Sequence, residues 1–185
     1  MFKIFQFIAK FLKIFFFGIM PFVLLSGGSK SDFESIKIEK GVCSFNIDGE
    51  RNFHLNGKAT FSKKIEQDRF GNTIGKLLLS FTSINEGEKQ TLEFIIASET
   101  KMNHGIPVGI HKIKNLDRLL HKFNGVYGFA DFGGISELPF FIKSGDVTII
   151  ECFSNNVNGK LEVQLENANG ESLNVEGSFN ADIKV

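Results

Sequence analysis

Apolar and polar residues alternate along most of the chain from Gly41 onward. A period of two is typical of strands that bury one face and expose the other. The alternating stretches are 43–47, 53–55, 59–61, 77–81, 92–96, 147–152, 161–165, 173–175 and 179–185, with a shorter one at 108–110. Residues with turn preference, such as Asp48-Gly49 and Asn56-Gly57, interrupt the pattern. This spacing predicts about nine or ten short strands.

The last third of the chain has the clearest pattern. Leu161, Val163 and Leu165 alternate with charged and polar residues. Asn169-Gly170 then provides the positive φ that a tight hairpin turn favours. The alternation resumes at Leu173 and continues to Val185. We therefore expect a three-stranded antiparallel meander at this end.

One segment departs from the strand pattern and predicts a short helix. Asn115 is a suitable N-cap, and Asn124-Gly125 offers a left-handed stop. The apolar residues between them share one helical face: Leu116, Leu119, Leu120 and Phe123. The predicted fold class is therefore all-β, an antiparallel β-sandwich or barrel with one short helical insert.

The first 28 residues resemble an export signal rather than part of the domain. The segment has three lysines and no acid, an apolar run over 14–25, and small residues from Ser26. This order is typical of a secretory signal, with cleavage expected after Gly28. An uncleaved membrane anchor is the alternative, but a span of about 20 residues would enclose Lys10 and Lys13. We expect a signal at 1–28, a polar tether at 29–40 and a single β domain at 41–185, exported to the periplasm, the cell surface or the exterior.

The charge balance argues against a nucleic-acid partner. Lys+Arg and Asp+Glu are both 21, and the three lysines of the signal segment leave a slight acidic excess in the rest. Nucleic-acid binding usually requires a concentrated basic patch, and only short pairs such as Lys63-Lys64 occur. Contact with a membrane is expected only through the N-terminal segment, if it is uncleaved.

Two parts of the sequence contain motifs of a known kind, one at the end of the apolar run and one in the body. Leu25-Ser26-Gly27 before Gly28-Ser29 resembles a lipoprotein signal in which Gly28 stands where the lipidated Cys would be. Without that thiol, no diacylglycerol can be attached at this position. In the body, the strand and turn residues of Gly145–Ile149, Val157–Val163, Val175–Phe179 and Phe53–Ala59 resemble those of small β-rich envelope lipoproteins of Bacteroidota-type bacteria. The resemblance implies a β fold and a lipoprotein ancestry, but no agreed activity.

Cys43 and Cys152 are the only cysteines of the chain. An exported protein meets an oxidising compartment, so a disulfide between them is one prediction. Such a bond would stabilise by about 4–5 kcal/mol on the chain-entropy model. The alternative is two buried thiols on separate strands.

The sequence offers no convincing metal, cofactor or catalytic site. The four histidines, His54, His104, His111 and His121, lack the close spacing of zinc ligands. A Gly-x-Ser-x-Gly elbow is absent, and neither cysteine has an adjacent base. Glu162 and Glu166 fit the solvated face of a strand. We therefore expect no cofactor and no enzymatic activity.

The segment from Gly125 to Ile142 is unusually rich in aromatic residues and glycine. Its aromatic side chains have two interpretations, a rim over an apolar pocket or core positions on edge strands. The residues concerned are Tyr127, Phe129, Phe132, Phe140 and Phe141.

The functional hypothesis is an exported, non-catalytic binding or interaction module of the cell envelope, with an unknown ligand or protein partner. The alternative is a barrel-type carrier of a hydrophobic small molecule, which requires a cavity. A hydrolase is a third class, and it requires titratable side chains that converge in a cleft.

Overall fold

The described residues of the computed structural model form nine β-strands and no helix. They are residues 38–67, 71–85, 87–99, 106, 108–113 and 125–184. The strands are β1 (Val42–Asp48), β2 (Phe53–Gln67), β3 (Thr73–Asn85), β4 (Glu88–Glu99), β5 (Gly109–Lys112), β6 (Gly125–Phe132), β7 (Phe140–Cys152), β8 (Asn156–Glu166) and β9 (Ser172–Ile183). All of them belong to one compact unit, Ile36–Val185.

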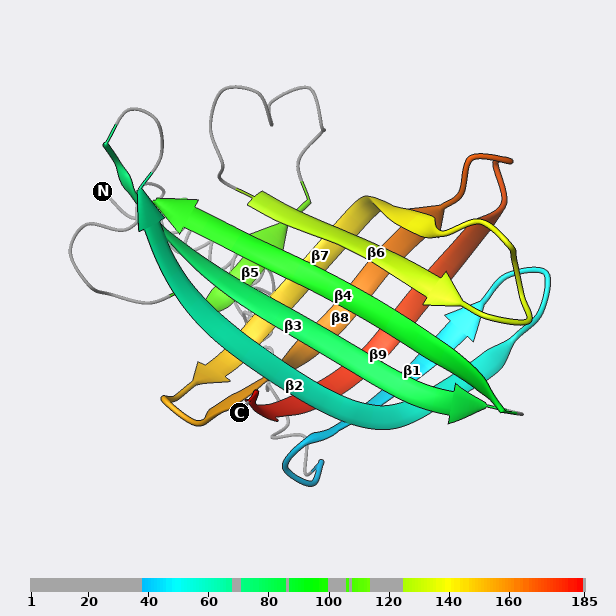
Figure 1. Cartoon of the computed structure of the whole chain (residues 1–185), viewed down its shortest axis with the longest axis horizontal. Helices are drawn as coiled ribbons and strands as arrows, with labels where there is room; N and C mark the ends of the chain where they lie inside the picture. Colours follow the sequence, from blue (N-terminus) through cyan, green and yellow to red (C-terminus); the bar gives the residue numbers. More distant parts are fainter. Residues whose placement is uncertain are drawn as a thin grey trace, which may run out of the picture. The chain divides into compact units, whose positions relative to one another are not determined.

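Eight of the strands close into an antiparallel barrel. The sheet order is β5-β7-β6-β4-β3-β2-β1-β9-β8, and the β7–β8 pairing closes the ring. β5 lies outside the ring and pairs with β7. In Figure 1, β2, β3, β4 and β6 form the near wall, and β7, β8, β9 and β1 cross behind them. The β6–β7 pairing is the shortest of the ring, with two residue pairs, and the other pairings cover most of the strand edges, which limits edge-to-edge association.

The interior of the barrel is filled with phenylalanine. Seven Phe side chains are fully buried: Phe45, Phe61, Phe81, Phe94, Phe132, Phe140 and Phe179. Phe81 is central among them, with ring centroids 4.9 Å from Phe45 and 5.1 Å from Phe179. Each fully buried side chain of this size contributes about 1.5–3 kcal/mol of transfer free energy. The phenylalanines that are frequent in the sequence therefore supply much of the core.

The far wall bends sharply at Gly145. The register between β7 and β8 shifts between Ile142 and Ser144, which is typical of a β-bulge. Gly145 follows with φ of 106°, and a Cβ there would lie 2.1 Å from the backbone oxygen of Glu162. Only glycine allows β8 to approach this closely.

The two ends of the barrel chain lie side by side. The backbone N–H of Gly41 donates to the oxygen of Asn180 at 2.7 Å. Lys40 forms an ion pair with Asp182 at 3.0 Å, and this hydrogen-bonded contact lowers the pKa of the Asp182 carboxyl. The chain thus enters before β1 and leaves after β9 at one place.

The all-β class and the closing meander are confirmed, with β7, β8 and β9 paired in sequence order. The choice between sandwich and barrel is decided in favour of a barrel, with nine strands in the described residues. The predicted helix after Asn115 falls on 114–124, which lies outside the described residues.

Candidate binding groove

The near wall of the barrel carries apolar side chains on its solvent side. Leu77 and Leu79 are buried in the core, so Leu78 between them points outward because strand side chains alternate. Leu78 pairs with Ile95 on β4, and Ile95 pairs with Tyr127 on β6. These three outward side chains therefore form a continuous row across the wall. Ile95 is 38% exposed.

A second outward row runs beside the first and changes in character from one strand to the next. Thr60 on β2 pairs with Ser80, Ser80 with Glu93, Glu93 with Phe129, and Phe129 with Phe141 on β7. Phe129 and Phe141 are 39% and 55% exposed. This row is therefore polar on β2 and aromatic on β6 and β7.

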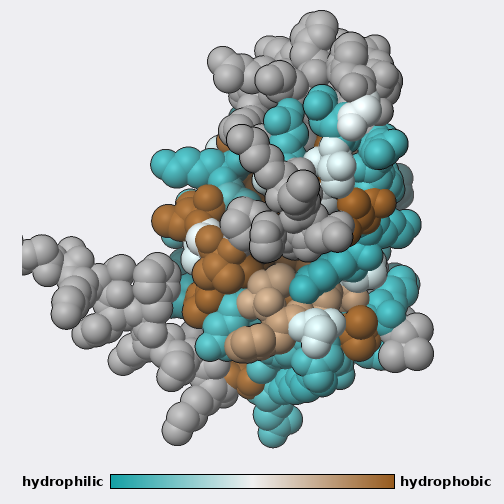
Figure 2. Space-filling model, turned by 90° about the vertical axis from the view of Figure 1, so that its left-hand side faces the viewer, coloured by the Kyte–Doolittle hydropathy of each residue, from teal (hydrophilic) through white to brown (hydrophobic). Residues whose placement is uncertain are grey.

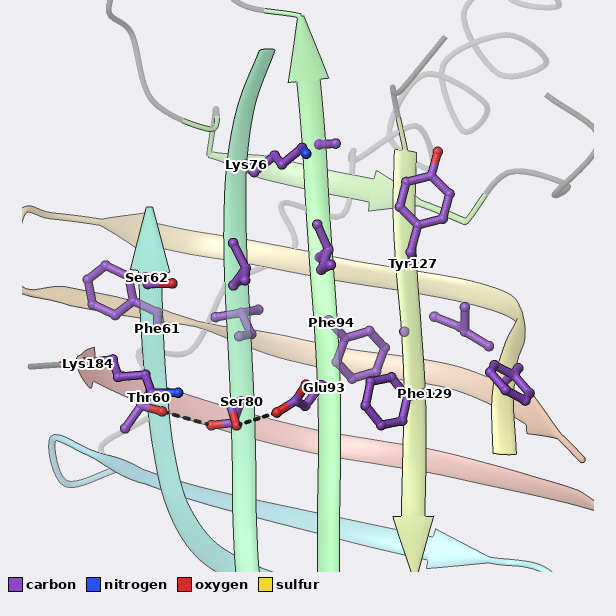
Figure 3. Close-up of a pocket in the computed structure, with 17 residues that line it drawn as sticks. Thr60, Phe61, Ser62, Lys76, Ser80, Glu93, Phe94, Tyr127, Phe129 and Lys184 are labelled. Carbon is purple, nitrogen blue, oxygen red and sulfur yellow. Dashed lines mark hydrogen bonds between the residues drawn. The ribbon is translucent and has the colours of Figure 1, made fainter. Parts of the chain in front are cut away.

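The two rows line an open groove of about 580 Å³ (Figure 3). This volume is within the usual range of small-molecule sites. The outward-facing lining residues are Thr60, Ser62, Lys76, Leu78, Ser80, Glu93, Ile95, Ala97, Tyr127, Phe129 and Phe141. Core positions of the same strands and Lys184 complete it.

Phe94 closes the barrel interior beneath the groove. Its ring occupies the space that a side chain would fill at Gly128, where a Cβ would lie 2.6 Å from the ring carbon Cδ1. Gly128 is the direct partner of Phe94 across the β4–β6 pair. The glycine therefore allows the Phe94 ring to pack directly against the backbone of β6. Because this ring fills the interior here, the space for a ligand lies on the outer face of the wall.

Hydroxyl groups and one carboxylate are connected at the β2 side of the groove. The hydroxyl of Thr60 donates to the backbone oxygen of Ser80 at 3.5 Å, and the hydroxyl of Ser80 donates to Oε1 of Glu93 at 3.2 Å. Figure 3 shows these residues in one row across β2, β3 and β4. The Ser80 bond directs the Glu93 carboxylate toward the polar side.

Lys184 completes this polar side. Its backbone N–H donates to the oxygen of Phe61 at 2.7 Å, which holds the residue after β9 against β2. In Figure 3 the Lys184 side chain lies across β2, with its nitrogen beside Thr60. No ion pair of this ammonium with a carboxylate occurs among the residues that the structure describes.

The other end of the groove contains a second lysine and the phenol of Tyr127. Lys76 forms an ion pair with Glu66 at 2.5 Å, and the donated hydrogen bond lowers the pKa of the Glu66 carboxyl. Burial raises the pKa of the Tyr127 phenol, so the phenol stays neutral at physiological pH.

The structure divides the predicted aromatic rim into two groups. Tyr127, Phe129 and Phe141 line the groove, as the rim interpretation requires. Phe132 and Phe140 are each 1% exposed and belong to the core, as the alternative interpretation requires.

Sequence reasoning missed the groove residues Leu78, Ile95, Glu93 and Lys184. A signal was present, because Leu78 stands between two core leucines and Ile95 between Phe94 and Ile96. An apolar residue at an outward position breaks the alternation expected of a half-buried strand.

The predicted disulfide between Cys43 and Cys152 is wrong, because both side chains are free thiols. Cys43 is on β1 and Cys152 at the end of β7, three strands away in the sheet order. Three strand spacings are about 14 Å along the wall, whereas bonded cysteines need Cα atoms within about 7 Å. Cys43 is fully buried, and burial raises the pKa of its thiol to about 12.

The predicted surface positions of two histidines can be compared with the structure. His54 is exposed on β2, and His111 lies on β5. His104 and His121 fall outside the described residues. Within the described ranges, no group of three His, Cys, Asp or Glu side chains is placed to hold a metal ion.

The end of the barrel presents a separate apolar group. Ile65, Phe153 and Ile183, near the ends of β2, β7 and β9, are 57%, 56% and 44% exposed. Lys63 donates to the backbone oxygen of Phe153 at 2.7 Å, which connects two of these ends. Figure 2 shows apolar residues gathered among polar ones at this end.

The residues of the predicted signal, including Leu25, Ser26, Gly27 and Gly28, lie outside the described residues. The described segments contain no helix long and apolar enough to cross a membrane.

Comparison with known proteins does not assign a family. No protein-family model, no curated protein and no solved structure matches this chain. The functional argument therefore depends on the barrel and its groove.

Proposed function

We propose that this protein is an exported, non-catalytic binding module whose ligand occupies the outer groove of the near wall. The observation that supports the proposal is the row Leu78–Ile95–Tyr127, apolar at positions that face solvent. Exposed apolar groups that gather in a concave site are typical of binding surfaces. Export is supported by the signal-like N-terminal segment.

A carrier of a hydrophobic small molecule is the second candidate, and the groove favours it over a ligand inside the barrel. An eight-stranded barrel has an interior just wide enough for side chains or one small ligand. Here Phe45, Phe81 and Phe179 meet in that interior. A carried molecule would therefore bind to the outer face.

A hydrolase has less support from the same residues. Glu93 is the one carboxylate among the described residues that line the groove, and none of these residues is a histidine. Paired acid–base chemistry requires two suitably spaced groups.

The test uses the full chain and the neutral fluorescent probe N-phenyl-1-naphthylamine, whose emission rises in apolar sites. Ile95→Asp places a charge in the groove, and we expect it to weaken probe binding by about tenfold, because desolvating a carboxylate is costly. Ile84→Asp is the matched control, because Ile84 is 78% exposed and does not line the groove.

Any probe bound by the N-terminal segment is the same in all three proteins, so the difference between them reports the groove. Circular dichroism checks that both variants fold. Equal probe binding by the wild type and the two variants would contradict the proposed function.

A further inference from the structure

The polarity of the groove changes in one direction across the near wall. The β2 side has the hydroxyls of Thr60 and Ser62, and the Lys184 nitrogen lies beside Thr60. The β6 and β7 side has the exposed rings of Phe129 and Phe141. A ligand that matches both sides is an amphiphile, with its polar head over β2 and its apolar part over β6 and β7.

The charges at the polar side favour an anionic head. Lys184 lines the groove at this side, and the one carboxylate of the described lining, that of Glu93, is hydrogen-bonded to Ser80. Asp182, the acid nearest to Lys184 in sequence, is engaged by Lys40 at 3.0 Å. A carboxylate beside Lys184 would accept a charge-assisted hydrogen bond from its ammonium.

Glu93 lies between the two sides of the groove, paired with Ser80 on β3 and with Phe129 on β6. The orientation of the ligand therefore follows from Lys184 at one side and the two exposed rings at the other. The Glu93 carboxylate is directed toward Ser80, away from the first row, which leaves Leu78 and Ile95 as an apolar path between the two sides.

The length of the groove suits one acyl chain. From Thr60 on β2 to Phe141 on β7 the row crosses four strand spacings, about 19 Å in all. A chain that fills one leaflet of a bilayer covers about 15 Å. The aromatic end of the groove remains open to solvent at Phe141, so the tail has room at its end.

We propose that the groove binds a single-chain anionic amphiphile, a free fatty acid, with its carboxylate at Lys184 and its tail along Leu78 and Ile95 to Phe129 and Phe141. This inference depends on the proposed function, because it names the ligand class of the same groove. The carboxylate would be recognised by charge and the tail by burial of apolar surface.

The test measures displacement of N-phenyl-1-naphthylamine from the full chain by palmitic acid, hexadecanol and hexadecylamine, each below its aggregation concentration. These probes have the same tail and differ in head charge. We expect palmitate to displace the probe at about tenfold lower concentration than hexadecanol, with hexadecylamine the weakest. Added salt should reduce the difference, because Lys184 is exposed.

Lys184→Gln should bring palmitate and hexadecanol to within about twofold of each other without changing the hexadecanol value. Lys160→Gln is the control, because it removes an equal charge from an exposed position on β8 outside the groove. It should keep the full preference for palmitate. Both substitutions are on the surface and leave the core intact.

The possible failures are distinguishable. If Ile95→Asp abolishes probe binding but palmitate is no better than hexadecanol, the ligand class is wrong and the proposed function stands. If Lys160→Gln and Lys184→Gln lower the preference equally, the carboxylate is not held at Lys184 and the inference is overturned. If Ile95→Asp leaves probe binding unchanged, the groove is not a binding site.

Discussion

The buried thiol of Cys43 should make the barrel less stable at alkaline pH. The thiol is fully buried on β1, with its sulfur 3.9 Å from the backbone oxygen of Lys58. Burial raises its pKa from 9.0 to about 12, because the thiolate would lose its hydration in the core. A raised pKa favours the protonated form in the folded state, so this stability is complete below about pH 9 and is lost as the pH rises toward 12.

The size of the effect follows from the two pKa values. At pH 10 the thiol of the unfolded chain is mostly ionised and the folded one is not, which lowers the free energy of unfolding by about 1 kcal/mol. By pH 12 the loss approaches about 4 kcal/mol. For a domain with a total stability of about 5–15 kcal/mol, this is a large fraction.

The assay is urea unfolding, followed by circular dichroism, at several pH values from 7 to 10.5. Cys43→Ala removes the titrating group, so its stability should fall less between pH 7 and pH 10 than that of the wild type, by about 1 kcal/mol. All other ionisable groups are common to the two proteins, so their contributions cancel in the comparison. Cys152→Ala is the control and should keep the wild-type slope. Parallel pH curves for wild type and Cys43→Ala would refute the reasoning.

Three further substitutions test the core, the bend and the junction of the chain ends. Phe81→Ala should lower the free energy of unfolding in urea by about 3–5 kcal/mol, because the cavity forms among packed rings; a loss below about 1 kcal/mol would contradict a solid interior. Gly145→Ala should cost more than about 1 kcal/mol in the same assay, because φ is 106° and the new Cβ meets the Glu162 backbone oxygen; an unchanged urea midpoint would exclude the close approach of β8. Lys40 lowers the pKa of Asp182 from 3.8, so the pair stabilises the fold above this pH and is lost as the pH falls through the folded value. Asp182→Asn should therefore reduce the fall in the free energy of unfolding at acid pH. A fall equal to that of the wild type would show that the pair does not form in solution.

The strands were predictable because their signal is local. Leu161, Val163 and Leu165 alternate with solvated neighbours, and the structure buries these three residues on β8. Val108 and Ile110 indicated a short strand, and β5 covers Gly109–Lys112. In both cases the pattern of side chains along one segment is sufficient to predict the structure.

The closure of the sheet was not predictable in the same way. It depends on pairings such as β1 with β9, in which Cys43 meets Phe179 across a large separation in sequence. The local alternation is the same in a sandwich and in a barrel, so the pattern left both open. The disulfide prediction failed for the same reason, because only the sheet order reveals how far apart β1 and β7 lie.

The groove was partly predictable from composition. The aromatic segment drew attention to Tyr127, Phe129 and Phe141, but the face of each side chain depends on the register with β4 and β7. Phe140 and Phe141 are adjacent in sequence, but their side chains point to opposite faces of β7. Phe140 lies in the core and Phe141 lines the groove. A shift of one residue in pairing would exchange them.

The junction of Gly41 with Asn180 has a consequence for how this barrel can be combined with other proteins. A domain whose entry and exit points coincide can be inserted into a surface loop of a host protein without separating the two halves of that host. By the same geometry, a short linker between the two ends would allow the chain to be opened at another turn, such as the one at Asn169-Gly170. The barrel is therefore suited to serve as a transplantable module.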